Sequence, residues 1–310
     1  MAHSPTIRKP RALHAGSRVA LVAPAGPVNA ERLQASQERC IELGLEPIVY
    51  PAALEQQRFL AGPDEHRLRD LQTAFDAHDI DAVWALRGGY GTTRILSRLD
   101  LSALRRSPKP FIGFSDNTAI HVRMFAHALA SFHGPHPGAA FPVETRAAFH
   151  KVLFECDPPG YLPQRSEDPM PRPLVSGRCE APLIGGNLSL LAALCGTANA
   201  LHADGCLLFI EDIAEPAYRV DRMLTQLRSA GALDGVTGIA FGRFTEQPSE
   251  EDEAIESVMR EHAQQLGVPA AADFPFGHID HNWTLPVGVR ARLDADSATL
   301  EITESAVTGS

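Results

Sequence analysis

The stretch FIGFSDNTAI, residues 111–120, decides the expected fold. Its apolar start stops at Gly113, one serine follows at Ser115, and helix-forming residues resume from Thr118. A serine at a tight strand-to-helix bend projects its hydroxyl out of the sheet, and the first N–H groups of the helix point toward whatever that hydroxyl attacks. The stretch therefore predicts a nucleophile with an anion-binding site beside it.

The same stretch also has a purely structural interpretation. The nucleophile elbow of hydrolases reads G-x-S-x-G, whereas here Asp116 follows the serine and Asn117 occupies the last position. Ser115 or Asp116 would then only cap the helix that runs through Ile120, since both residue types are favoured N-caps. The decapeptide alone leaves both interpretations open.

The residues before this stretch alternate between strand and helix patterns. Buried strands are expected at 18–25, 45–50 and 82–86, separated by a helix that starts near Asn29 and an amphipathic helix that starts at Asp64. This β-α-β-α-β alternation predicts a parallel sheet with helices on both faces. Ligands of such sheets collect at the carboxyl ends of the strands.

A glycine-rich turn, RGGYG at residues 87–91, follows the third predicted strand. Adjacent glycines permit positive φ and let bare backbone N–H groups face a ligand. The turn is not the G-x-G-x-x-G of dinucleotide sites and lacks the lysine of a phosphate loop, so a cofactor role is not expected. It is either a plain βα turn or an oxyanion donor and substrate seat beside Ser115.

The second half of the chain has its own pattern after a proline-rich segment. Residues 156–177 contain six prolines and few apolar residues, which indicates a linker between residues 1–155 and 178–310. We therefore expect an α/β protein with an N-terminal parallel-sheet domain that carries the nucleophile elbow and a smaller C-terminal α/β domain with a mixed or β-rich end. The C-terminal elements expected are a strand at 205–210 that ends in Glu211-Asp212, helices at 216–229 and 251–264, a strand at 236–241, and a β-hairpin or meander at 287–302.

Composition excludes several classes of partner. The 310 residues carry a net charge of −10, and no block of lysine or arginine is long enough to follow a phosphate backbone, so nucleic acid and anionic membranes are not expected partners. No apolar run is long enough for a signal peptide or a membrane span, which predicts a cytoplasmic protein. The five cysteines are widely spaced and form no C-x-x-C pair, as expected of reduced thiols.

A serine nucleophile needs a base, an acid that orients the base, and N–H donors for the oxyanion. Ser115, Glu211 and His278 supply these residue types in that order. The competing chemistry is a metal hydrolase, because His133 with His136, and His278 with His281, form two H-x-x-H pairs. Neither pair has the i, i+4 spacing of zincins or a glutamate between its histidines, so no metal and no other cofactor is predicted.

The order of short motifs along the chain resembles the LD-carboxypeptidases, serine peptidases that remove the terminal D-alanine from muropeptide tetrapeptides in peptidoglycan recycling. The resemblance extends from about residue 18 to 302. It rests on APA at 23–25, LAG at 60–62, RGGYG at 87–91, GFSD at 113–116, HGP at 133–135, GGNL at 185–188, FIED at 209–212, YR at 218–219, DR at 221–222 and GH at 277–278.

The resemblance implies a role for each candidate site residue. Ser115, Glu211 and His278 match the family's Ser-Glu-His triad, with Glu215 as a rival acid four residues farther on. The N–H groups of Asp116 and Gly89 match the oxyanion hole. Because a carboxypeptidase must hold a free terminal carboxylate, which suits a guanidinium, Arg87 is the candidate for that contact, although a surface ion pair is its alternative role.

The resemblance also implies a small muropeptide substrate, a homodimer, and a site that forms only between the two domains. Two other functions stay open from the sequence. One is the related microcin-immunity peptidases, which cleave an amide in an aminoacyl-nucleotide antibiotic, and Trp283 is the aromatic residue that could stack on a nucleotide there. The other is a binding module without catalytic activity, which the intact Ser-Glu-His set argues against.

Overall fold

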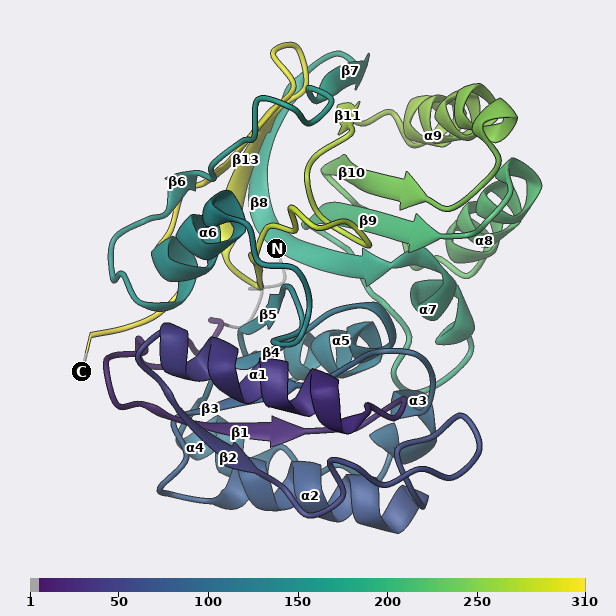
Figure 1. Ribbon diagram of the computed structural model, residues 1–310. Coiled ribbons are helices and arrows are strands. Elements are labelled where there is room, and N and C mark those ends of the chain that lie inside the picture. Colours follow the sequence, from purple (N-terminus) through teal and green to yellow (C-terminus); the bar gives the residue numbers. More distant parts are fainter. Residues whose placement is uncertain (1–5, 310) are drawn as a thin grey trace.

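The computed structural model describes residues 6–309, which form two β-sheets with helices packed on them. Figure 1 shows one sheet in the lower half with α1 and α2 on its opposite faces, and the other in the upper half with α7, α8 and α9 at its side. The helices are α1 (Ala30–Glu42), α2 (Asp64–Asp76), α3 (Thr92–Leu96), α4 (Ser102–Arg106), η1 (Ser115–Asn117), α5 (Thr118–Ala126), α6 (Val143–Leu153), α7 (Leu188–Ala193), α8 (Ala217–Ser229), η2 (Ser249–Glu251) and α9 (Asp252–Leu266).

The first sheet has six strands in the order β12-β5-β4-β3-β1-β2. Strands β1 to β5 are parallel, and β12 from the end of the chain pairs antiparallel with β5. Because β1 lies between β2 and β3, the connections that leave β1 and β3 diverge and open a crevice at the carboxyl ends of these strands. The strands are β1 (Arg18–Val22), β2 (Glu46–Val49), β3 (Ala82–Ala85), β4 (Phe111–Gly113), β5 (Ser131–His133) and β12 (Leu285–Val287).

The second sheet has eight strands in the order β6-β14-β13-β8-β9-β10-β11-β7. The central strands β8 to β11 are parallel, and antiparallel strands flank them on both sides. The strands are β6 (Gly160–Tyr161), β7 (Arg172–Val175), β8 (Arg178–Asn187), β9 (Leu207–Ile213), β10 (Gly238–Thr245), β11 (Ala270–Ala272), β13 (Arg290–Asp294) and β14 (Thr299–Ile302).

The expected α/β class is confirmed, including the parallel first sheet and the mixed second sheet. The segment 156–177 contributes β6 and β7 to the second sheet, and β12 crosses back to the first sheet. The proposed division into residues 1–155, a linker and residues 178–310 stays a prediction. Within residues 6–309 the longest helix, α9, has 15 residues, and none of the helices has the length and apolar character that a bilayer crossing demands.

The core of the first sheet is built around Trp84 on β3. Its indole is fully buried, stacks on Phe149 of α6 with the ring centroids 4.9 Å apart, and donates its N–H to the carbonyl of Pro135 at 2.9 Å. The hydrogen bond satisfies the polar end of a side chain whose burial stabilises the fold. Trp84 thereby fixes the loop after β5 over the end of the sheet where the candidate site lies.

Candidate active site

Ser115 lies in a strained turn between β4 and α5. Its φ is +62°, in the left-handed region that residues other than glycine seldom adopt, whereas Phe114 before it is extended. A Cβ on Gly88 of the glycine turn would lie 2.8 Å from Ser115 Cβ and 2.9 Å from Ser115 Oγ. The glycine turn and the serine are therefore in direct contact. Only a glycine at residue 88 leaves room for the Ser115 hydroxyl.

Asp116 fixes the turn from the other side. Its buried carboxylate accepts a hydrogen bond from the Thr92 N–H at 2.8 Å, and the Thr92 hydroxyl donates to the Asp116 carbonyl at 2.6 Å. Burial raises the pKa of Asp116, against the opposing effect of the hydrogen bonds from Thr92. The side chain thus ties the elbow to the start of α3, and Gly89, with φ of +100°, is exposed in the glycine turn between β3 and α3.

Glu211 and His278 are brought together although 67 residues separate them. Glu211 is fully buried on β9, and its Oε2 lies 2.7 Å from Nδ1 of His278. A Cβ on Gly277, whose φ is +117°, would lie 2.9 Å from Glu211 Cβ, so glycine allows this close approach. With Nδ1 engaged by the carboxylate, Nε2 is the ring nitrogen left to take a proton.

Opposing effects act on the imidazole of His278. Burial lowers its pKa, but the hydrogen bond and the negative charge of Glu211, with smaller contributions from Asp212 and Glu246, outweigh burial, and the pKa is raised above its ordinary 6.5. The carboxylate therefore favours the imidazolium, the form that a general base takes after it has accepted a proton.

The rival acid Glu215 has polar partners other than His278. Its carboxylate is 3.5 Å from Arg219 Nη1 and 3.5 Å from the hydroxyl of Ser189. Asp212, next to Glu211, accepts hydrogen bonds from the side chain of Asn187 at 2.8 Å and the hydroxyl of Ser189 at 2.7 Å. Burial and then the charge of Glu211 raise the pKa of Asp212 to about 6. Glu211 is thus the acid that contacts His278.

Phe114, the residue before Ser115, packs against His278. The centroid of the Phe114 ring lies 4.9 Å from that of His278, which places the residue before the serine against the imidazole. Within residues 6–309 the structure has a hydrogen bond between Glu211 and His278 but none between Ser115 and His278. Catalytic hydrogen bonds are often long in enzymes without substrate and tighten when substrate binds.

The two sheets meet at this site. The Asn187 N–H at the end of β8 donates to the Thr118 hydroxyl of α5 at 3.0 Å, and a Cβ on Gly186 would lie 2.4 Å from the same oxygen. The elbow of the first sheet is therefore packed directly against the strand next to Glu211 in the second. Glycine at residue 186 is what permits this packing.

Arg87 is exposed, and its Nη1 donates to the carbonyl of Pro27 at 2.9 Å. The loop of Pro27 also contacts the glycine turn, because the Gly26 N–H donates to the Gly88 carbonyl at 2.9 Å. Arg87 forms no ion pair with a described residue of the chain, contrary to the surface ion pair that was its alternative role. Its free donors are available to a ligand in the crevice.

Arg67, which the sequence pattern did not single out, links the segments that follow β1 and β3. Its guanidinium is buried and donates to the carbonyl of Pro24 after β1 and, at 2.9 Å, to the carbonyl of Gly91 after β3, and it pairs with Asp64. The signal was present, because an arginine occupies the inward stripe of α2 that Leu71 and Phe75 share. A charged residue in an apolar stripe is costly unless it is paired.

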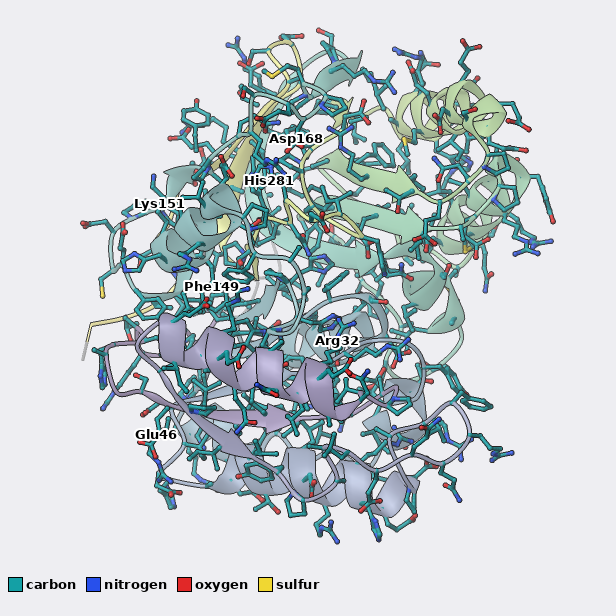
Figure 2. The ribbon with its side chains drawn as sticks, in the orientation of Figure 1. Arg32, Glu46, Phe149, Lys151, Asp168 and His281 are labelled. Atoms are coloured by element: carbon teal, nitrogen blue, oxygen red, sulfur yellow. The ribbon has the colours of Figure 1, made fainter. Side chains whose placement is uncertain are left out.

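The remaining histidines and Trp283 have structural contacts. His133 and His136 are buried beside Phe114. His281 pairs with Asp168, and both residues are labelled in Figure 2. Trp283 is buried and donates its indole N–H to the Pro163 carbonyl at 2.6 Å. These contacts attach the segment 156–177 to the loop of His278. No group of three or more potential metal-binding side chains is found in the described part of the chain.

Comparison with known proteins gives the family. Residues 19–134 match the family model of the LD-carboxypeptidase N-terminal domain, and residues 180–293 match that of the C-terminal domain. A relative from Streptomyces coelicolor is 41% identical over 308 residues, covering 96% of this chain and 97% of its own. The chain belongs to the LD-carboxypeptidase family.

Other LD-carboxypeptidases and solved structures agree with the assignment. The murein tetrapeptide carboxypeptidase of Pseudomonas aeruginosa is 36% identical over 287 residues, covering 90% of this chain and 94% of its own. The muramoyltetrapeptide carboxypeptidase of Oxalobacter formigenes is 32% identical, with a TM-score of 0.80 over 92% of this chain and 97% of that one. An MccF-like protein of Bacillus anthracis, 24% identical, has a TM-score of 0.87 over 95% of this chain and 99% of that one, which shows the fold alone.

Proposed function

We propose that this protein is a serine carboxypeptidase that cleaves the bond between meso-diaminopimelate and the terminal D-alanine of muropeptide tetrapeptides. The observation that carries the proposal is the 2.7 Å contact between Glu211 and His278, which lies beside a serine held in a strained elbow. A Pseudomonas aeruginosa relative named for murein tetrapeptide supports the choice of substrate.

The proposed mechanism is acyl transfer through the Ser115 hydroxyl. Oγ attacks the carbonyl carbon of meso-diaminopimelate while Nε2 of His278 takes the hydroxyl proton, and Glu211 stabilises the imidazolium. The N–H groups of Asp116 and Gly89 receive the oxyanion. The tetrahedral intermediate then collapses, and the D-alanine nitrogen leaves with the proton from His278. Water, activated by His278, hydrolyses the ester and releases the tripeptide.

The proposal includes a closing step. Ser115 follows β4 of the first sheet, Glu211 lies on β9 of the second, and His278 lies in the connection from β11 to β12. A relative movement of these segments would bring Ser115 Oγ within hydrogen-bond distance of His278 Nε2. The same proposal takes the protein to be a cytoplasmic homodimer, as the sequence resemblance implies. Its subunit number can be measured by light scattering after gel filtration.

Mass spectrometry of the substrate tests the proposed function. L-Ala-γ-D-Glu-meso-diaminopimelate-D-Ala is incubated with the wild-type protein and with Ser115→Ala, whose folding is checked by thermal melting. We expect loss of one alanine with wild type and a rate lower by roughly three to six orders of magnitude with the variant, because members of a triad act as a unit.

Two other outcomes would contradict the proposal. Equal loss of alanine with both proteins would mean that Ser115 is only a helix cap. No loss with either would favour the aminoacyl-nucleotide amidase, although Trp283, the residue that could stack on a nucleotide in that alternative, is buried.

A further inference from the structure

Arg32 is a cation near the candidate site that has no anionic partner among residues 6–309. It lies in the first turn of α1, and its Nε is buried without a hydrogen-bond partner. Burial lowers the pKa of Arg32, and the charge of Arg87 lowers it further, with no carboxylate to oppose them. Arg32 is thus a partly buried guanidinium that the charge of Arg87 repels and that no described carboxylate pairs with, so an anion bound there would stabilise it.

Packing contacts place Arg32 against the loop after β5, which also contacts the elbow. A Cβ on Gly138 would lie 2.7 Å from the Arg32 carbonyl oxygen and 2.8 Å from its Cγ, so the loop after β5 packs against this residue. The same loop carries His136, whose Nε2 is 3.4 Å from the side-chain nitrogen of Asn117 in the elbow. In Figure 2 Arg32 lies on the side of α1 that faces the second sheet.

Arg87 reaches the same region from the glycine turn. Its contact with the Pro27 carbonyl links it to the loop that leads into α1, and the contact between Gly88 and Ser115 links the turn to the serine. Both arginines also act on one buried group, since burial and then the charges of Arg32, His278 and Arg87 hold the pKa of His136 well below its ordinary value. The two guanidiniums and the imidazole of His278 thus all lie near the buried imidazole of His136.

The position in the sheet is also one that binds anions. Arg32 follows β1 and Arg87 follows β3, the two strands whose connections diverge. Asn29 caps α1 by accepting the Arg32 N–H at 2.9 Å, and the positive end of this 13-residue helix lies at the carboxyl end of β1. Crevices of this kind are where open parallel sheets bind ligands.

We infer that Arg32 and Arg87 together bind the free carboxylate of the residue that leaves, so that the enzyme removes one C-terminal residue and discriminates against a blocked C-terminus. The inference rests on the proposed function and adds a second residue, Arg32, that determines specificity. A guanidinium donates two parallel hydrogen bonds to a carboxylate, and a pair of guanidiniums can engage both oxygens while the anion relieves their mutual repulsion.

The test compares the tetrapeptide acid with its C-terminal amide, which keeps the scissile bond but lacks the negative charge. For wild type we expect kcat/KM to favour the acid by about 100-fold. Arg32→Gln should lose roughly 10- to 100-fold on the acid and about threefold or less on the amide. Arg32→Lys keeps the charge without the paired donors and should recover part of the preference.

Arg98→Gln is the matched control, because it also removes one positive charge. Arg98 is exposed and pairs with Glu65 at 2.9 Å, and its loss should leave both rates unchanged. If folded Arg32→Gln cleaves acid and amide with the wild-type ratio, Arg32 does not bind the carboxylate, while turnover by wild type would still support the proposed function.

A binding measurement separates the two proposals if wild type cleaves neither peptide. Calorimetric titration of Ser115→Ala with acid and amide would then be decisive. Binding of the acid alone, lost in Ser115→Ala combined with Arg32→Gln, would support the carboxylate site and contradict only the hydrolysis. Equal binding of both peptides, or binding of neither, would overturn the carboxylate site.

Discussion

Replacing Gly88 by alanine should displace the proposed nucleophile without unfolding the protein. The added Cβ would lie 2.8 Å from Ser115 Cβ, whereas ordinary contact begins at 3.4 Å, so the two segments must separate by about 0.6 Å or more. Ser115 Oγ, at 2.9 Å, and the Asp116 nitrogen, at 3.2 Å, are also too close. Because Gly88 does not have positive φ, the backbone itself accepts alanine.

The displacement is expected to act on the chemical step. A misplacement of about 1 Å can cost about 100-fold in rate, so we expect kcat of Gly88→Ala to fall by about 100-fold and KM to change little. Single-turnover cleavage of the tetrapeptide measures the rate, and labelling by a serine-directed phosphonate reports the reactivity of Ser115 independently of the substrate.

Gly196→Ala is the control for a general loss of stability. Gly196 has φ of +78° and no atom within 4 Å of its added Cβ, so the substitution strains the backbone by about 1 kcal/mol at a site without such contacts. It should keep normal kcat. If Gly88→Ala folds and keeps kcat within about threefold of wild type, the contact with Gly88 does not position the nucleophile, and the reasoning is wrong.

Three further predictions concern the acid that orients the histidine. Glu211→Gln should lower kcat by roughly 10³- to 10⁴-fold, because the carboxylate that contacts His278 is lost, whereas Glu215→Gln should stay within about threefold of wild type; steady-state kinetics at pH 7 decides between the two acids. The second is the pH profile of kcat/KM. His278 must be neutral to act as the base and its pKa is raised, so wild-type kcat/KM should rise with pH through an apparent pKa above 6.5. In Glu211→Gln this rise should move to lower pH, because the effect of burial on His278 then dominates. The stability that the Glu211–His278 pair adds should be complete below pH 6.5 and be lost as pH rises through the raised pKa, which thermal melts across pH can follow; an unshifted limb in the variant would contradict the assigned contact.

Much of the first sheet could be predicted because its strands are short apolar runs between strong helix signals. The run before the elbow became β4, and the amphipathic helix expected from Asp64 became α2. The strand β8 was missed because one half of it pairs antiparallel with β13 and the other half parallel with β9, so no single alternation runs through it. Its Gly185-Gly186 pair also reads as a turn in the sequence, yet both glycines serve close packing.

The candidate site was predictable where chemistry restricts the residue type and not where geometry does. A serine in an elbow, a buried glutamate and a glycine-led histidine carry their signals locally, and the structure brings the last two into contact. Arg32 gave no such signal, because only the packing of the loops after β1, β3 and β5 shows that its charge lacks a partner. Electrostatic interactions between residues far apart in the sequence cannot be predicted from the spacing of motifs.

The return of the chain to the first sheet has a consequence for how the protein holds together. β12 covers the edge of β5, so a fragment cut within residues 156–177 would leave that edge bare on one piece and an orphan strand on the other. An open edge of unpaired N–H and C=O groups is a template for aggregation. We therefore expect that the two halves cannot be produced or cut apart as separate stable fragments, whatever relative movement the two sheets undergo.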